Sequence, residues 1–214
     1  MSTAVITLFD CATAPNPRRA RIFLAEKGVA HETVQVSLAQ GEQLGAAYRA
    51  INPACTVPAL RLEDGTVLTD NAAIAAYAEA RWPDPALLGR TPLEKAEIAS
   101  WHARIEAEGL WAVGEALRNG SPAMAGRALP GPENFDQIAA LAERGLRRTR
   151  LFLEMLDRRL EGRDTVAGEG FSIADILAVV SVDFARIVRI KPGPEHPNLL
   201  RWRQAMGQRP SMGL

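Results

Sequence analysis

The chain has 214 residues, of which 47% are hydrophobic, and it carries 25 basic and 25 acidic side chains. A balanced charge neither attracts phosphate backbones nor holds a protein on anionic lipid, so we expect no nucleic acid and no membrane among its partners. The start of the chain lacks the basic and apolar regions of a secretory signal, and no stretch approaches the roughly 20 apolar residues of a membrane span. We therefore expect a cytoplasmic protein.

Cysteine usage argues against a disulfide scaffold and against a zinc site. Cys11 and Cys55 are the two cysteines of the sequence, and no patterned histidines accompany them. We expect reduced thiols and no bound metal.

The first third of the chain begins with a strand, a helix and a second strand. AVITLFD at 4–10 is typical of a buried strand, and HETVQV at 31–36 alternates like another. Between them, Asn16 is expected as a helix N-cap followed by Pro17 at the first helical position, and Gly28 is the residue type found just past a helix end. These segments predict one βαβ unit.

A hairpin and a second main helix follow. A short helical segment is expected at 45–50. The strands PALRL at 58–62 and TVLT at 66–69 then flank a Glu-Asp-Gly turn at 63–65. A helix is expected to open at 70–71. The predicted order βαβαββα is that of a thioredoxin-like domain.

Prolines separate this α+β domain, predicted at 1–82, from a second domain of a different kind. Pro83 and Pro85 lie in a predicted linker at 83–92, and from 93 to 214 apolar residues recur at helical spacing. The sequence therefore predicts an all-α helical bundle in its second half.

The helix after Gly170 is expected to be the central one of the bundle. A wide apolar stripe runs from Ile173 to Val188, and Ser172 with Asp175 forms a pair resembling a capping box at its start.

Pro58, in the stretch INPACTVPAL at 51–60, lies where a strand begins and cannot donate to a sheet ladder. Two interpretations stay open. A cis bond before Pro58 would leave the Val57 backbone free to pair with a bound peptide as an added strand, whereas a rigid turn would have no binding role.

The VPAL segment at 57–60 and the FSIAD cap at 171–175 resemble the glutathione transferase family, and the resemblance extends over nearly the whole chain. It implies a thioredoxin-like glutathione-binding domain followed by a helical domain. The family has an acid-polar pair after the hairpin, here Asp70-Asn71, where serine is commoner than asparagine.

Asp70 and Asn71 also have a physical basis for binding a ligand. Amides at a helix N-terminus attract a carboxylate and an aspartate accepts from an ammonium, so the pair suits the zwitterionic γ-glutamyl end of glutathione. The alternative is that both residues only cap the helix. The resemblance further places Gln43 and Thr56 at the glycyl carboxylate, where solvated loop residues are the alternative.

Activation of the thiol is where the resemblance is weakest. The matched stretch CATAPNPRR places Ala14 where other classes have a serine, and Asn16 where beta-like members have cysteine and nu-like bacterial members have asparagine. Asn16 is the first candidate for holding the thiolate and Thr13 the second. Asn16 as a simple cap and a redox role for Cys11 both stay open.

We predict from these residues an enzyme that binds glutathione as cosubstrate and conjugates it to small hydrophobic electrophiles, and the resemblance implies a homodimer that acts in detoxification. The alternatives are a glutathione-dependent peroxidase or disulfide reductase, and a non-catalytic binding module with the same fold.

Overall fold

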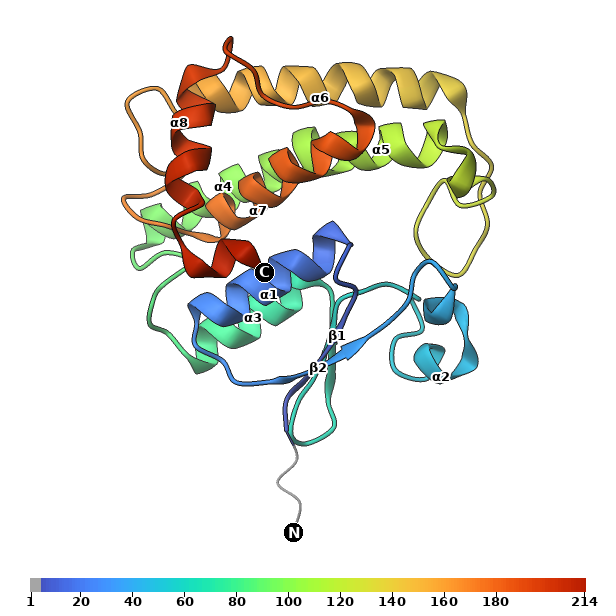
Figure 1. Ribbon diagram of the computed structural model, residues 1–214. Helices are drawn as coiled ribbons and strands as arrows, with labels where there is room; N and C mark the ends of the chain where they lie inside the picture. Colours follow the sequence, from blue (N-terminus) through green and yellow to red (C-terminus); the bar gives the residue numbers. More distant parts are fainter. Residues whose placement is uncertain (1–4) are drawn as a thin grey trace. The chain divides into compact units, whose positions relative to one another are not determined.

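The computed structural model describes residues 5–214. The chain divides into two units, drawn in Figure 1. The first extends through Pro85 and includes Pro130–Glu133 and Leu214, and the second consists of Ala86–Leu129 and Asn134–Gly213. An α+β unit is thus followed by a helical one, and each is described below by itself.

The first unit is built on a four-stranded sheet. Its strands are β1 (Thr7–Asp10), β2 (Glu32–Gln35), β3 (Ala59–Arg61) and β4 (Val67–Thr69). They lie in the order β2-β1-β3-β4, with β1 parallel to β2 and antiparallel to β3, and β3 antiparallel to β4. Each is shorter than its predicted segment, and the first residue of the segment predicted at 4–10 lies outside the described residues.

Helices complete the thioredoxin-like order. The two longer ones, α1 (Pro15–Glu26) and α3 (Asn71–Arg81), pack against each other and lie side by side in Figure 1. A 3-10 turn η1 (Glu42–Leu44) and the short helix α2 (Ala46–Arg49) connect β2 to β3. The predicted βαβαββα order is confirmed, and η1 is an addition to it.

The start of α1 differs from the prediction. Ala14 is the N-cap, Pro15 is the first helical residue, and Asn16 lies within the first turn, so the prediction of Asn16 as N-cap is wrong. The first-turn amides of a helix have no partner within it, so a helix accepts proline there, and the ring of Pro15 already has a helical φ. Asn16 instead accepts a hydrogen bond at 3.0 Å from Nη1 of Arg19.

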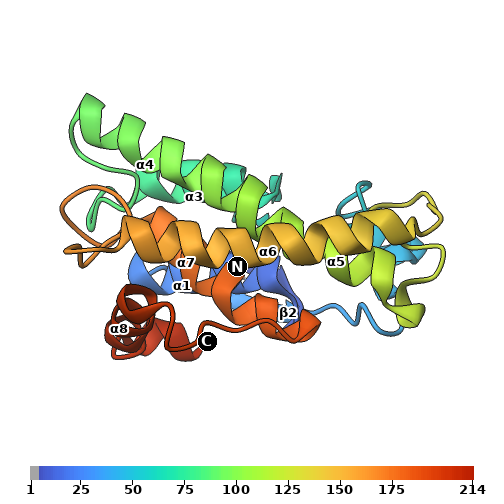
Figure 2. The same cartoon turned by 90° about the horizontal axis from the view of Figure 1, so that it is seen from above.

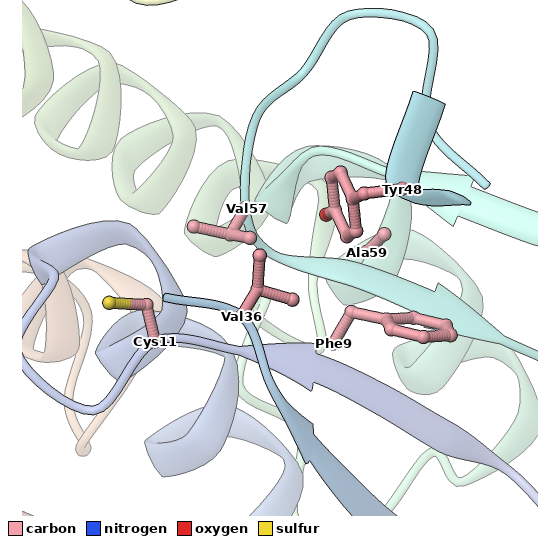
Figure 3. Packing of buried hydrophobic residues seen from close by; sticks show 6 residues of the cluster. All are labelled: Phe9, Cys11, Val36, Tyr48, Val57 and Ala59. Atoms are coloured by element: carbon pink, nitrogen blue, oxygen red, sulfur yellow. The ribbon is translucent and has the colours of Figure 1, made fainter. Parts of the chain in front are cut away.

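One face of the sheet carries a buried cluster, shown in Figure 3. Phe9 from β1 and Ala59 from β3 lie in it beside Tyr48 from α2, and Val36 and Val57 come from the segments that flank the strands. Burial of this apolar surface anchors the segments that follow β2 and precede β3.

The second unit consists of helices, several of which Figure 2 shows from above. The long ones are α4 (Pro92–Ile105), α5 (Trp111–Gly120), α6 (Ala139–Arg159), α7 (Ile173–Phe184) and α8 (Pro197–Met206), and the short ones are a π-helical segment η2 (Glu106–Leu110), η3 (Pro122–Met124), η4 (Ala185–Val188) and η5 (Pro210–Gly213). The predicted all-α second half is confirmed.

Helix α7 is the buried centre of this unit, as predicted. Nine of its residues, from Ala174 to Val182, are buried. The capping box is also confirmed, because the Ser172 hydroxyl accepts from the Ala174 amide and the Asp175 carboxylate accepts from the Ser172 amide. The predicted apolar stripe ends sooner, since η4 follows Phe184 and Ile187 is 55% exposed.

Candidate functional site

The sheet register brings together the segments that were predicted to bind a ligand. Phe9 pairs with Ala59, and Ala59 pairs with Thr69. The carboxyl end of β1, the amino end of β3 and the carboxyl end of β4 therefore lie at one edge of the sheet. Val57 and Asp70 each lie within two residues of this row, and ligands of open α/β sheets bind at the carboxyl ends of the strands.

Val57 offers an unpaired backbone at this edge. Its side chain is buried, and the bond that joins it to Pro58 is cis, one of the two interpretations of the sequence. Within the described part of the chain, neither its amide nor its carbonyl takes part in a hydrogen bond. An extended peptide can therefore pair with this residue as an added strand.

Asp70 and Asn71 form the start of α3. Asp70 is the N-cap with φ of 79°, and its Oδ1 accepts from the Ala72 amide at 2.8 Å. Asn71 is the first helical residue and is buried. A positive φ is uncommon for a residue other than glycine. The exposed carboxylate of Asp70 and the helix N-terminus thus lie next to each other.

The backbone carbonyl of Thr56 accepts two hydrogen bonds from side chains. This carbonyl accepts from the Tyr48 hydroxyl at 2.7 Å and from Asn52 Nδ2 at 2.8 Å, while the Thr56 hydroxyl accepts from the same Asn52 nitrogen at 3.2 Å. Burial raises the pKa of Tyr48 to about 12, so the phenol keeps its proton and donates. Gln43 lies in η1, and no hydrogen bond in the described residues joins it to Thr56.

The segment between β1 and α1 carries the two thiol-site candidates. Thr13 is exposed, and its hydroxyl lies 3.6 Å from the Cys11 sulfur. Asn16 is also exposed, and because its Oδ1 accepts from Arg19, its Nδ2 is the end left to donate. Both side chains are therefore close to the N-terminus of α1.

Three residues beside this segment were not predicted from the sequence. Asp10, Gln35 and Arg21 form a hydrogen-bonded group that contacts the backbone after β1. They lie far apart in sequence and show no local pattern. The parallel register, in which Asp10 pairs with Gln35, brings those two side chains together, and Arg21 reaches Asp10 from α1. A correct alignment of β1 with β2 is therefore the signal that would have revealed the Asp10–Gln35 pair.

Residues 5–214 contain no cluster of three or more histidine, cysteine or acidic side chains arranged to hold a metal ion. None of the helices in this range is long and apolar enough to cross a membrane.

The chain is 35% identical to glutathione S-transferase 2 of Saccharomyces cerevisiae over 210 residues, which are 96% of this chain and 87% of that protein. Residues 13–81 match the glutathione S-transferase N-terminal domain, and residues 121–210 match the C-terminal domain. The chain belongs to the glutathione S-transferase family. The resemblance inferred from the VPAL and FSIAD segments is thereby confirmed.

Solved structures of glutathione S-transferases and their relatives have the same fold. The crystal structure of Gtt2 from Saccharomyces cerevisiae has a TM-score of 0.88 and 32% identity, and the match covers 97% of this chain and 98% of that one. Ure2p in complex with glutathione has a TM-score of 0.82 at 21% identity, covering 99% of this chain and 98% of that one, which shows the fold alone. Glutathione is the ligand of this transferase family, so the prediction of glutathione as cosubstrate is confirmed.

Proposed function

We propose that the chain binds glutathione at the sheet edge formed by Val57, Asp70 and Asn71. The observation that carries this proposal is the unpaired Val57 backbone in the same row of the sheet as the start of α3. The cysteinyl backbone of glutathione pairs with Val57 as an added strand. Asp70 accepts from the γ-glutamyl ammonium, and the amides at the start of α3, with the Asn71 side chain, hold its carboxylate. Gln43 and Thr56 are proposed for the glycyl carboxylate.

The proposed reaction is addition of the glutathione sulfur to a small hydrophobic electrophile. Asn16 donates from Nδ2 to the thiolate, the Thr13 hydroxyl is a second donor, and the first-turn amides of α1 add partial positive charge. The thiolate attacks an electrophilic carbon and forms a C–S bond. The electron pair of the broken bond leaves with the leaving group or, in an addition, takes a proton from water. We place this activity in the cytoplasm.

A second candidate function is reduction of peroxides or disulfides by glutathione. It is favoured by Ala14, which provides no hydroxyl or thiol at the position where other classes activate the sulfur. Two glutathione molecules supply both electrons in such a reduction, so it needs no cysteine of the protein. A third candidate is a non-catalytic binding module. Such a protein would show no turnover, whether or not it binds glutathione.

Calorimetry with glutathione tests the binding site through a matched pair of variants. Asp70 and Asp64 are both exposed and each accepts one backbone amide two residues ahead, at 2.8 Å and 2.9 Å. Asp70→Ala should weaken binding by roughly 1 to 3 kcal/mol, the cost of removing the partner of a charged group. Asp64→Ala should leave the affinity unchanged, because Asp64 lies in the hairpin turn.

The absence of measurable heat for the wild-type protein at millimolar glutathione would contradict the proposed site. Initial rates with aryl halides, peroxides and mixed disulfides then decide among the candidate functions. Conjugation is expected to be the fastest reaction.

A further inference from the structure

Asp10 is buried at the carboxyl end of β1, where the chain leaves the sheet toward the candidate thiol site. Its side chain is 2% exposed, and it forms an ion pair with Arg21 of α1. Its other oxygen accepts from Gln35 Nε2 at 2.8 Å. A buried carboxylate is tolerated only when it is paired and hydrogen-bonded, and both conditions are met here.

This carboxylate determines how the Gln35 amide is oriented. An ionised Asp10 can only accept, so Gln35 must present its Nε2 to it. The Gln35 Oε1 is then left to accept from the Ala12 amide, at 3.0 Å. Arg21 also donates to the Ala12 carbonyl at 3.2 Å. Both polar backbone groups of Ala12 are therefore held by side chains that Asp10 orients.

The backbone held in this way leads directly to the proposed thiol site. The Ala14 amide donates to the Cys11 carbonyl at 3.0 Å, which closes a turn around Ala12 and Thr13. A displacement of Ala12 would move the Thr13 hydroxyl and the first-turn amides of α1. Catalytic geometry tolerates little movement, because a displacement on the order of 1 Å can cost about a hundredfold in rate.

We propose that Asp10 is a positioning residue of the active site, which acts through Gln35 and Arg21 to hold the segment between β1 and α1 against the sulfur of bound glutathione. This inference rests on the proposed function. Asp10, Gln35 and Arg21 touch neither the sulfur nor the electrophile, but they determine where the donors to the thiolate lie.

The substitution Asp10→Asn tests the chain of contacts. The new asparagine must give its oxygen to Arg21 and turn its nitrogen toward Gln35, so the Gln35 amide has to rotate. The Ala12 amide then faces a donor in place of an acceptor. We expect its hydrogen exchange to become faster, the pKa of the bound glutathione thiol to rise by about one unit and kcat to fall about tenfold, while the KM for glutathione changes little.

A double variant that exchanges the carboxylate and the amide between positions 10 and 35 should restore the contacts. In Asp10→Asn/Gln35→Glu the new glutamate accepts from both the new asparagine and the Ala12 amide, and one negative charge remains near Arg21. The double variant should recover the thiol pKa and kcat of the wild-type protein. Glu63→Gln is the control, because it removes a carboxylate from another arginine pair of the same unit, Glu63–Arg81, and should alter neither quantity.

One outcome refutes the proposed function, and two others refute only the positioning role. A wild-type protein that binds no glutathione refutes the proposed function, although the exchange rate of the Ala12 amide still reports on the Asp10 contacts. An unchanged thiol pKa and kcat in Asp10→Asn, with glutathione still bound, refutes the positioning role and leaves the proposed function standing. Slower turnover that the double variant fails to restore likewise refutes the positioning role.

Discussion

At the scale of single residues, Asn16 shows how a corrected position sharpens a functional hypothesis. A side chain at the N-cap uses its oxygen to accept a backbone amide. Asn16 lies within the first turn instead, and its oxygen accepts from the Arg19 guanidinium. The exposed nitrogen is therefore free to donate to a ligand, so the capping alternative loses its basis.

Asn16→Ala should raise the pKa of the bound glutathione thiol and lower turnover. It should reduce the free energy of unfolding by about 1 kcal/mol, because it removes one hydrogen bond to Arg19. Thiolate absorbance followed against pH measures the first effect, and thermal unfolding measures the second. Cys11→Ser is the comparison and should leave the thiol pKa and turnover unchanged. Loss of activity in that variant would show that the catalytic role belongs to Cys11 and not to Asn16.

At the scale of elements, sequence patterns predicted the strands and helices whose signals are local. The hairpin followed from Glu63-Asp64-Gly65, and the start of α7 followed from Ser172 and Asp175. The start of α1 was misplaced because two prolines alternate with Asn16 and either proline suits a first turn. The π-helical segment Glu106–Leu110 was not predicted, since π-helices are rare and occur mostly as single turns inside α-helices.

The candidate site was likewise predictable only in part. Val57, Asp70 and Asn71 belong to short motifs with a local signature. Asp10 and Gln35 meet only through strand pairing, so no pattern in a single segment identifies them.

Two helical glycines of the second unit should respond to alanine in opposite ways. A Cβ at Gly145 of α6 would lie 2.5 Å from the Ala116 backbone nitrogen and 2.8 Å from the Ala112 carbonyl oxygen, whereas a Cβ at Gly114 of α5 meets nothing within 4 Å. Gly145→Ala should destabilise the protein by about 2 kcal/mol through overpacking. Gly114→Ala should stabilise it by about 1 kcal/mol through helix propensity. Denaturant unfolding measures both, and equal effects of the two variants would contradict the close approach of α5 and α6.

The Asp175 cap makes part of the stability depend on pH. Burial raises the pKa of Asp175 from 3.8 to about 6 in the folded protein. The folded state therefore keeps this proton at pH values where the unfolded state has lost it, and the contribution of Asp175 to stability falls as the pH rises from about 4 to about 6.

The titration of Asp175 can be observed without a substitution. Trp202 donates from Nε1 to Asp175 Oδ1 at 3.3 Å. The Trp202 indole resonance should consequently titrate with a midpoint of about 6, whereas the exposed indole of Trp111 should not follow that curve. A Trp202 midpoint near 4, the ordinary value for aspartate, would show that the four hydrogen bonds to the carboxylate offset its burial.

At the scale of the whole molecule, the exposed apolar side chains of the helical unit provide a way to test for self-association. Leu93 is 79% exposed, Trp111 56% and Ile138 55%, all in the helical unit. Family membership leads us to propose a homodimer, and each of these exposed side chains is a candidate for its interface.

Sedimentation velocity at micromolar concentration should therefore return a mass near twice that of the 23.2 kDa chain. A two-fold dimer repeats each contact, so one substitution in the interface removes two contacts per dimer. Trp111→Ser and Leu93→Ser are suited to locating the interface, because both side chains are exposed and their loss should leave the folded monomer intact. A shift toward the monomer mass in one variant, with unchanged thermal unfolding of the monomer, identifies that residue as part of the interface. A monomer mass for the wild-type protein at every concentration would refute the dimer, and the proposed glutathione site, which one chain supplies by itself, would be unaffected.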